Sequence, residues 1–464
     1  MAMISEIYKQ IWEHSPYVQT SKSYHALTQL TSQLINQYEE QGRITNDPFS
    51  PTRERTLSLP MEDLRKELKG KTCLVTGGLG CVGSMLVNEL LKFDVKSIII
   101  LDKRKTTGTD YPEKVVCVQC DIRNAQRVRD IFTLCRPGIV FHTAAQRDPG
   151  FAESHVMETV TTNVLGTVNV VKACEDSGTV KQFVFSSTGK ASRYYTEEIY
   201  AGTKKLCEFI LDSYARTSDI KYSMVRFTHI LDNSLMNVEL KNGSINNDYL
   251  ALHSPGKYVT AQNAKEAAYL MLNALVYSTN KQCQFLLVRN LAWPVESLEM
   301  ALYHIKQSGR NIPVIFSGNP LGYTEKFFRG QMDWSNPNEL NLLMNVYECK
   351  SRRLNDAQDI IISRPCKTDK STLLQVLDEI RDADRESETK ASLIRGLKEL
   401  VRESLRTVDK EETANILQWG LDPVCLKAEN IHIADFNETL QLLLESLEGT
   451  EYHKEAEDLI YQHA

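Results

Sequence analysis

The sequence lacks any apolar run long enough to cross a membrane. A spanning helix needs about 18 or more consecutive apolar residues, and the longest run here, around Ser97–Leu101, has only the length of a strand. The first residues, MAMISEIYKQIWEHSP, also lack the basic and then apolar layout of a signal peptide. We therefore expect a cytoplasmic protein without a membrane partner.

An excess of positive charge is also missing. The 464 residues include 54 Lys and Arg against 60 Asp and Glu, which gives a formal net charge of -6. Proteins that bind nucleic acid usually carry a basic patch or a basic isoelectric point. We therefore expect no nucleic-acid partner.

The cysteines and histidines do not form a framework. The eleven cysteines are scattered, and several fall in segments expected to be buried, such as Cys73, Cys120 and Cys174. This pattern indicates reduced thiols rather than the disulfides of a secreted domain. Cys117 and Cys120 have CxxC spacing but lie on an expected strand without a second pair nearby, so we interpret them as structural. The histidines lack the paired spacing of a metal site, and we expect no metal ion.

What the chain does have is an alternation of short apolar segments with helical ones. The expected strands are Thr72–Val75, Ser97–Leu101, Val115–Val118, Ile139–His142 and Gln182–Phe185. Strands that alternate with helices form a parallel sheet with helices on both faces. We therefore predict an α/β fold with a Rossmann-like doubly wound parallel sheet.

The composition and the spacing of apolar residues change along the chain, and we predict four consecutive regions. These are an N-terminal helical extension and linker at 1–68, a Rossmann domain at 69–225, a small substrate-side lobe at 226–334 and a C-terminal helical region at 335–464. The linker is the polar stretch Asn46–Pro60, which contains three prolines. The last region is rich in charge with Leu and Ile at three-four spacing, which is typical of a solvated helical bundle.

A glycine-rich turn follows the first expected strand and leads into a helix. Its first glycine permits a tight turn, the second lets the backbone approach a pyrophosphate, and the third lets the helix pack closely on the sheet. The free N–H groups and the dipole at the start of that helix favour phosphate groups. We therefore predict that a dinucleotide is bound by Gly77, Gly78, Leu79, Gly80, Cys81, Val82 and Gly83.

The next strand ends at Asp102. An acidic side chain at this place accepts hydrogen bonds from a ribose diol and favours NAD. The basic residues that follow, Lys103, Arg104 and Lys105, could meet a 2′-phosphate, so NADP is the alternative. We include Asp102 and Lys103 among the cofactor-binding residues.

A tyrosine and a lysine stand four residues apart at Tyr200 and Lys204. On a helix this spacing puts both side chains on one face. A nearby ammonium lowers the pKa of a phenol, so the tyrosine can exchange a proton with a substrate hydroxyl. The strand before this helix ends in Ser186-Ser187-Thr188, where a hydroxyl can hold the substrate oxygen. We predict Thr188, Tyr200 and Lys204 as catalytic, with the last two also at the cofactor.

Together these motifs resemble a known family. The segments TGGLGCVG, Asp121-Ile122-Arg123, FHTAA, TTNVLGT, SST and YAGTK resemble the extended short-chain dehydrogenase/reductases. They are most similar to the polysaccharide-biosynthesis branch, which includes the UDP-N-acetylglucosamine 4,6-dehydratases and C5-epimerases. The resemblance covers about residues 60–330. Three further elements of the branch resemble Ser187–Ala191, Arg147–Glu153 and Gly322–Lys326.

The resemblance implies roles for further residues. At the cofactor, Asp121 and Ile122 would flank the adenine, and Ala144 and Ala145 would line the nicotinamide side. Asn163 would brace the active-site strands. The residues that would bind the substrate are Arg147, Glu153 and Arg226. Lys190 would be catalytic, because its family counterpart removes the C5 proton of the sugar. The implied partners are a small-molecule substrate of the nucleotide-sugar class and a second copy of the chain, because many such enzymes form dimers through helices of the Rossmann domain.

The chain departs from the branch on the substrate side. The aspartate that donates a proton to the leaving 6-hydroxyl is Gly189 here, and the branch's Arg-Phe-Gly-Asn is Arg226-Phe227-Thr228-His229. The basic loop that follows is replaced by Asp232–Glu239, which contains no arginine. Candidates for a substitute acid are Asp148, Glu153, Tyr194 and Tyr195.

Three hypotheses follow from this pattern. The first is an NAD(P)-dependent enzyme that oxidises C4 of a nucleotide sugar transiently, as a dehydratase or an epimerase. The second is a net oxidoreductase of the same fold on a different alcohol or ketone, in secondary metabolism for example. The third is a cofactor-binding scaffold without a reaction, whose helical ends mediate assembly.

Overall fold

The computed structural model of the chain describes residues 2–105, 111–233, 235–323 and 326–463. The chain divides into two compact units, each built from segments that are far apart in the sequence. The larger unit comprises Leu57–Phe227, Ala268–Arg289 and Leu321–Ala464, and the smaller comprises Met1–Thr56, Thr228–Ala267 and Asn290–Pro320.

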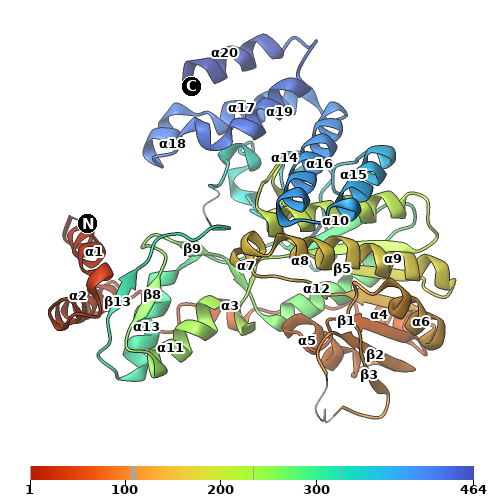
Figure 1. Cartoon of the computed structure of the whole chain (residues 1–464), viewed down its shortest axis with the longest axis horizontal. Coiled ribbons are helices and arrows are strands. Elements are labelled where there is room, and N and C mark those ends of the chain that lie inside the picture. The colour runs from red at the N-terminus through yellow and green to blue at the C-terminus, as the bar shows by residue number, and fades with distance from the viewer. Residues whose placement is uncertain (1, 106–110, 234, 324–325, 464) are drawn as a thin grey trace. The chain divides into compact units, whose positions relative to one another are not determined.

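A nine-stranded sheet forms the centre of the larger unit (Figure 1). Its strands, in spatial order, are β14 (Arg353–Leu354), β15 (Ile360–Ser363), β11 (Gln284–Val288), β6 (Lys221–Phe227), β5 (Gln182–Thr188), β4 (Ile139–His142), β1 (Thr72–Thr76), β2 (Ser97–Asp102) and β3 (Val115–Gln119). The seven strands from β11 to β3 run parallel to their neighbours, and β15 and β14 add antiparallel pairs at the other edge. The predicted doubly wound fold is confirmed.

The strand order places a reversal between β1 and β4. From β1 the chain first builds outward to β2 and β3, and then returns to β4 on the other side of β1. Ligands of open α/β sheets bind at such a switch point, outside the carboxyl ends of the strands. The register aligns those ends, because Thr76 pairs with His142, and the Thr76 hydroxyl lies 2.7 Å from Nδ1 of His142.

Helices follow the strands as the alternation predicts. Those that matter for the site are α5 (Cys81–Leu90), α7 (Pro149–Ser154), α8 (Val156–Val160), α9 (Gly166–Ser177) and α10 (Ile199–Ala215). The helix α10 is buried on nearly all sides, since even its charged residues Lys204, Lys205 and Glu208 are less than a tenth exposed. A helix that is enclosed in this way must be packed against other elements besides the sheet.

The C-terminal region is helical, as expected, but it also contains strands. Its helices are α14 (Val346–Cys349), α15 (Lys370–Asp382), α16 (Glu386–Arg406), α17 (Lys410–Gly420), α18 (Pro423–Ala428), α19 (Asn437–Ser446) and α20 (His453–His463). The apolar run Ile360-Ile361-Ile362 is buried in β15 and pairs with β11. The sequence predicts a mostly helical region after residue 335, and this short apolar run is a strand within it.

The smaller unit has a core of its own. The N-terminal helices α1 (Ala2–His14) and α2 (Ser21–Glu40) share it with α13 (Ser297–Ser308) and with the paired strands β8 (Leu250–Leu252) and β13 (Val314–Phe316). The stretch expected as a linker contains the short helix α3 (Ser50–Glu54), and Arg55 forms an ion pair with the buried Glu266. The N-terminal helices therefore fold together with residues more than 200 positions later.

Two absences concern the partners of the protein. Within the part of the chain that the structure describes, no helix is both long and apolar enough to traverse a bilayer. The same described residues contain no group of His, Cys, Asp and Glu side chains that could hold a metal ion.

Candidate active site

The glycine turn between β1 and α5 forms a close-packed cradle. Gly77 has a φ of +67°, and a Cβ atom added there would lie 2.7 Å from the backbone nitrogen of Ala144. A Cβ atom at Gly83 would lie 2.3 Å from the carbonyl oxygen of Gly77. Any other residue at these two positions would therefore displace the turn. The absence of side chains there keeps the backbone open to a ligand.

The first turn of α5 has no side-chain cap. Its N-cap residue is Gly80, which supplies no side-chain acceptor for the N–H groups of the first turn. Such groups, together with the positive end of the helix dipole, suit a pyrophosphate. The glycine cradle and this uncapped helix start therefore fit a dinucleotide, and the segment from Gly77 to Gly83 is placed as the sequence predicts.

Asp102 ends β2 beside the glycine turn. Its Oδ2 accepts a hydrogen bond of 3.1 Å from the backbone N–H of Leu79, and its Oδ1 accepts the N–H of Arg104 at 3.0 Å. The Arg104 guanidinium also pairs with this carboxylate at 3.1 Å. Burial opposes ionisation, but the hydrogen bonds and charge of Arg104 outweigh it and lower the pKa of Asp102. The carboxylate is thus anionic, and Lys103 next to it is exposed.

The remaining predicted cofactor residues lie around the same edge of the sheet. Asn163 ties the end of β4 to α10, because its Oδ1 accepts the N–H of Gln146 at 2.8 Å and its Nδ2 donates to the Thr203 hydroxyl at 3.0 Å. Asp121 forms an ion pair of 2.6 Å with Arg123. Ile122 is buried against Gly166 of α9. Ala144 and Ala145 are partly exposed just after β4.

Tyr200 lies in the first turn of α10, next to the end of β5. Its phenol lies near the side chain of Thr188, the last residue of that strand. Burial raises the pKa of Tyr200 to about 12. The side chain of Thr188 and the charge of Arg147 oppose this rise, and the charge of Glu198 adds to it. The structure therefore brings together the predicted tyrosine and the predicted threonine.

Lys204 lies one turn after Tyr200 on α10 and holds the end of β5. Its Nζ donates to the carbonyl oxygen of Ser186 at 2.8 Å and lies 4.6 Å from the centre of the Phe185 ring. Burial lowers the pKa of Lys204 to about 8, although the neighbouring Cys207 and Glu208 favour its charge. Lys204 thus fixes the carboxyl end of β5.

Lys190 is held by a carboxylate that the sequence reasoning missed. Its Nζ lies 2.5 Å from Oε1 of Glu198, and the other carboxylate oxygen of Glu198 accepts from Nη1 of Arg193 at 2.9 Å. Glu198 is the N-cap residue of α10 and its side chain is only 3% exposed. The sequence could have indicated this role, because Glu198 precedes Tyr200 by two residues and an N-cap residue lies beside the first turn of its helix.

Gly189 follows Thr188, and no larger residue fits there. A Cβ atom at this position would lie 2.1 Å from Cδ2 of Leu343. Leu343 belongs to the segment 341–348 of the C-terminal region, which packs over the turn that carries Lys190. The space beside Gly189 is therefore filled by the protein itself.

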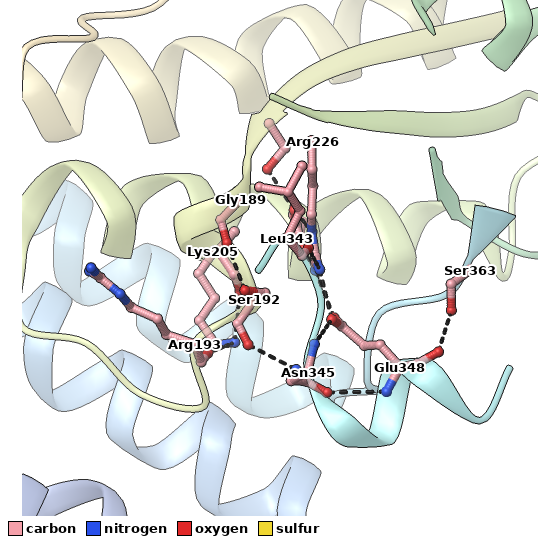
Figure 2. A network of polar contacts seen from close by, with 12 residues as sticks. Gly189, Ser192, Arg193, Lys205, Arg226, Leu343, Asn345, Glu348 and Ser363 are labelled. Carbon is pink, nitrogen blue, oxygen red and sulfur yellow. Dashed lines mark hydrogen bonds and ion pairs between the residues drawn. The ribbon is translucent and has the colours of Figure 1, made fainter. Parts of the chain in front are cut away.

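A buried polar network holds this segment in place (Figure 2). The five N–H groups of Arg226 all donate within the protein: two to Glu208 of α10, two to Glu348 of α14 and one to the carbonyl oxygen of Leu343, at 2.6 to 3.0 Å. Asn345 adds a bond from Nδ2 to the carbonyl oxygen of Ser192 at 2.9 Å. Arg226 is 1% exposed, so this placement leaves it no donor for a substrate.

The other predicted substrate residues have different surroundings. Arg147 is exposed and its charge acts on Tyr200. Glu153 lies within α7, accepts the N–H of Ile199 at 2.8 Å and pairs with Lys390 at 3.1 Å. The element at 322–326 approaches the start of α7, where a Cβ atom at Gly322 would lie 2.7 Å from the carbonyl oxygen of Pro149. Thr324 and Glu325 of that element lie outside the described residues.

The proposed substitute acids are engaged elsewhere. Asp148 caps α7 by accepting the N–H of Phe151. Tyr194 donates to the carbonyl oxygen of Gly330, and burial raises its pKa well above the usual range. Tyr195 donates to Glu197, and Glu153 caps α10. Among the residues that the structure describes, Glu198 pairs with Lys190.

Comparison with known proteins agrees with this arrangement. A family model described as polysaccharide biosynthesis protein matches residues 73–309, just over half of the chain. The capsular polysaccharide biosynthesis protein CapD of Staphylococcus aureus is 26% identical over 320 residues, which cover 62% of this chain and 52% of that protein. An inverting UDP-N-acetylglucosamine 4,6-dehydratase of Campylobacter jejuni is 27% identical over 175 residues, which cover 35% of this chain and 50% of the dehydratase.

A solved structure supports the fold alone. Pen from Bacillus thuringiensis is 21% identical with a TM-score of 0.53, and the match covers 65% of this chain and 89% of that chain. The chain spans about half the length of the two curated relatives named above. The match of the family model, together with the glycine cradle and the Thr188–Tyr200 pair, shows that the chain belongs to the polysaccharide biosynthesis protein family, a branch of the extended short-chain dehydrogenase/reductases.

Proposed function

We propose that the protein oxidises C4 of a nucleotide sugar transiently with bound NAD(P)+ and returns the hydride within the same catalytic cycle. The observation that carries this proposal is the placement of Tyr200 beside Thr188, at the edge of the sheet where the glycine cradle also lies. The 4,6-dehydratase among the relatives supports the substrate class.

Different residues of the chain have different roles in the first step, which is the oxidation at C4. Thr188 would hold the 4-hydroxyl of the sugar while Tyr200 removes its proton. Arg147 favours the phenolate, because its charge opposes the rise in the pKa of Tyr200. The nicotinamide, when bound, would accept the hydride from C4 and later give it back. Lys204 would keep Thr188 in register by holding the end of β5.

The 4-ketone would make the proton on C5 acidic, and the outcome then depends on acids and bases. Lys190 and Glu198 form an ion pair that holds one proton to share. Transfer of this proton to the carboxylate would give a neutral amine and a carboxylic acid. The amine would take the C5 proton while the acid protonates the departing 6-hydroxyl, which releases water and restores the ion pair. The hydride removed from C4 would then return at C6, and the Lys190 ammonium would protonate C5, which gives the 4-keto-6-deoxy sugar. The proton that Tyr200 took from the 4-hydroxyl would return to Lys190 and reset the site. The pair would thus replace the acid that Gly189 cannot supply.

Incubation with UDP-N-acetylglucosamine and NAD+ tests the proposal. We expect a 4-keto-6-deoxy sugar or an inverted sugar, identified by mass spectrometry and NMR, without net reduction of the cofactor. Recovery of unchanged substrate at saturating cofactor, across a panel of UDP-sugars, would overturn it.

A net oxidoreductase is the second candidate. The segment Asp232–Glu239 contains no arginine to bind a diphosphate, which favours a substrate other than a nucleotide sugar. This function requires a lasting change in cofactor absorbance that is stoichiometric with product. A cofactor that returns to its starting absorbance after turnover excludes it.

A further inference from the structure

Helix α16 of the C-terminal region covers the helices that flank the active site. It packs against α8 and α10, and α15 packs against both α16 and α10 (Figure 1). Leu393 and Leu397 of α16 are each 1% exposed. The outer face of the catalytic helix is therefore closed by residues about 190 positions later in the same chain.

The contact is closest at the turn that carries the catalytic pair. Gly202 lies between Tyr200 and Lys204, and a Cβ atom there would lie 2.8 Å from Cδ1 of Leu397 and 3.7 Å from Cδ2 of Leu393. The lack of a side chain lets the two helices approach, as small residues do at close helix crossings. A shift of α16 would therefore be felt directly at this turn.

Polar contacts connect α16 to the beginnings of both helices. Glu386, the first residue of α16, accepts the N–H of Met157 in the first turn of α8 at 2.8 Å. Lys390, one turn later, pairs with Glu153 at 3.1 Å, and Glu153 accepts the N–H of Ile199 at 2.8 Å. Ile199 is the first residue of α10 and the neighbour of Tyr200. Lys390 thus reaches the catalytic turn through a single carboxylate.

We propose that α16 positions the first turn of α10 and covers, within one chain, a helical face of the Rossmann domain that a second copy could otherwise have used. Apolar helix faces must be covered in water, whether by a partner or by the chain itself. Here Leu393, Leu397 and the two polar contacts cover α8 and α10 from within the chain. Lys390 is accordingly a positioning residue for Tyr200, and the face of α8 and α10 is not a site of self-association.

Hydrogen–deuterium exchange of the full chain tests the first part. Lys390→Met removes the charge that holds Glu153, and we expect the peptide around 196–206 to exchange about threefold faster, in line with a contact of this exposure. Lys398→Met is the matched control, because Lys398 lies on the same helix and pairs with Glu438 of α19 instead. Lys390→Arg should keep the wild-type rate. Equal exchange in the two methionine variants would overturn the positioning role.

The same measurement at low and at high protein concentration tests the second part. We expect the amides of 156–177 and 199–215 to exchange at the same rate at both concentrations, even where the protein associates through another surface. Protection of these two segments that increases with concentration would show a partner on this face and overturn the proposal. Neither readout needs turnover, so the result is independent of the proposed reaction.

Discussion

Leu343 fills the space beside Gly189, because a Cβ atom at position 189 would lie 2.1 Å from its Cδ2 atom and would force this leucine to move. The segment that carries Leu343 is fixed by Arg226, which binds the carbonyl oxygen of this leucine. The space beside Gly189 is therefore filled by a C-terminal segment that Arg226 holds in place. The carboxylate next to Lys190 comes from Glu198.

The first prediction follows from this relationship. Gly189→Ala should lower the free energy of unfolding by about 1–3 kcal/mol, the usual cost of overpacking. Gly138→Ala is the control, since a Cβ atom there would meet no atom closer than 3.6 Å. Adding Leu343→Ala to Gly189→Ala should cost less than the two single changes combined. Urea unfolding of the four variants measures this, and strict additivity would contradict the relationship.

The sequence predicted the strands and the glycine turn of the sheet because their signals are local. The turn at Gly77–Gly83 and the spacing of Tyr200 and Lys204 lie within single strand–helix units, and the five predicted strands are all present. The Thr188–Tyr200 contact was also foreseeable, because the strand ends just before the helix.

The sequence did not predict contacts made by distant segments. The sequence around Gly189 does not indicate a contact with Leu343, and the sequence around Glu153 does not indicate one with Lys390. In each pair the two residues are more than 150 positions apart. For the same reason Arg226 was expected to meet a substrate, whereas two buried glutamates occupy its guanidinium. The four consecutive regions remain a prediction, since composition and residue spacing along the sequence do not reveal how distant segments combine into units.

The second prediction concerns the proton transfer. Tyr200→Phe removes the hydroxyl that takes the substrate proton, and kcat should fall by about 10²–10⁴-fold. The Kd for the cofactor should change little. Tyr214→Phe makes the same change at the other end of α10 and should keep full activity. A Tyr200→Phe enzyme with wild-type kcat would exclude the proposed role.

The third prediction is a pH dependence. Burial lowers the pKa of Lys204 to about 8, so its ammonium is present below this pH and is lost as the pH rises through it. The neutral amine holds the Ser186 carbonyl less strongly, and kcat/KM should therefore decline above about pH 8. Lys204→Arg keeps its charge at all these pH values, so the decline should disappear even where the maximal rate is lower. A wild-type profile that stays flat above pH 8 would speak against this assignment.

The fourth prediction concerns the choice of cofactor. Asp102 is anionic and lies beside Leu79 of the glycine turn, where it can accept from a ribose diol once Arg104 turns away. Asp102→Asn should weaken NAD+ binding about tenfold, since a hydrogen bond to a charged group contributes roughly 1.5–3 kcal/mol. NADP+ binding should improve, because the 2′-phosphate no longer meets a negative charge. Fluorescence titration with both nucleotides measures the change, and equal losses for the two would contradict a ribose role.

The last prediction separates the two halves of the proposed reaction. Glu198→Gln removes the carboxylate that pairs with Lys190 and Arg193 but leaves Tyr200 and Thr188 in place. Oxidation at C4 should continue while the later proton transfers fail, so reduced cofactor should accumulate, measured by its absorbance, without release of product. Because the charge of Glu198 raises the pKa of Tyr200, the oxidation step should also reach its plateau at a lower pH in this variant.

Glu197→Gln is the control for this experiment. Glu197 is exposed, accepts from Tyr195 and does not contact Lys190, so its loss should leave both the rate and the pH profile as they are. A purely structural role for Glu198 would lower every step in parallel and would not move the pH profile. A shifted profile with trapped reduced cofactor therefore distinguishes a working acid–base pair from a simple helix cap, and a uniform loss would assign Glu198 to the cap.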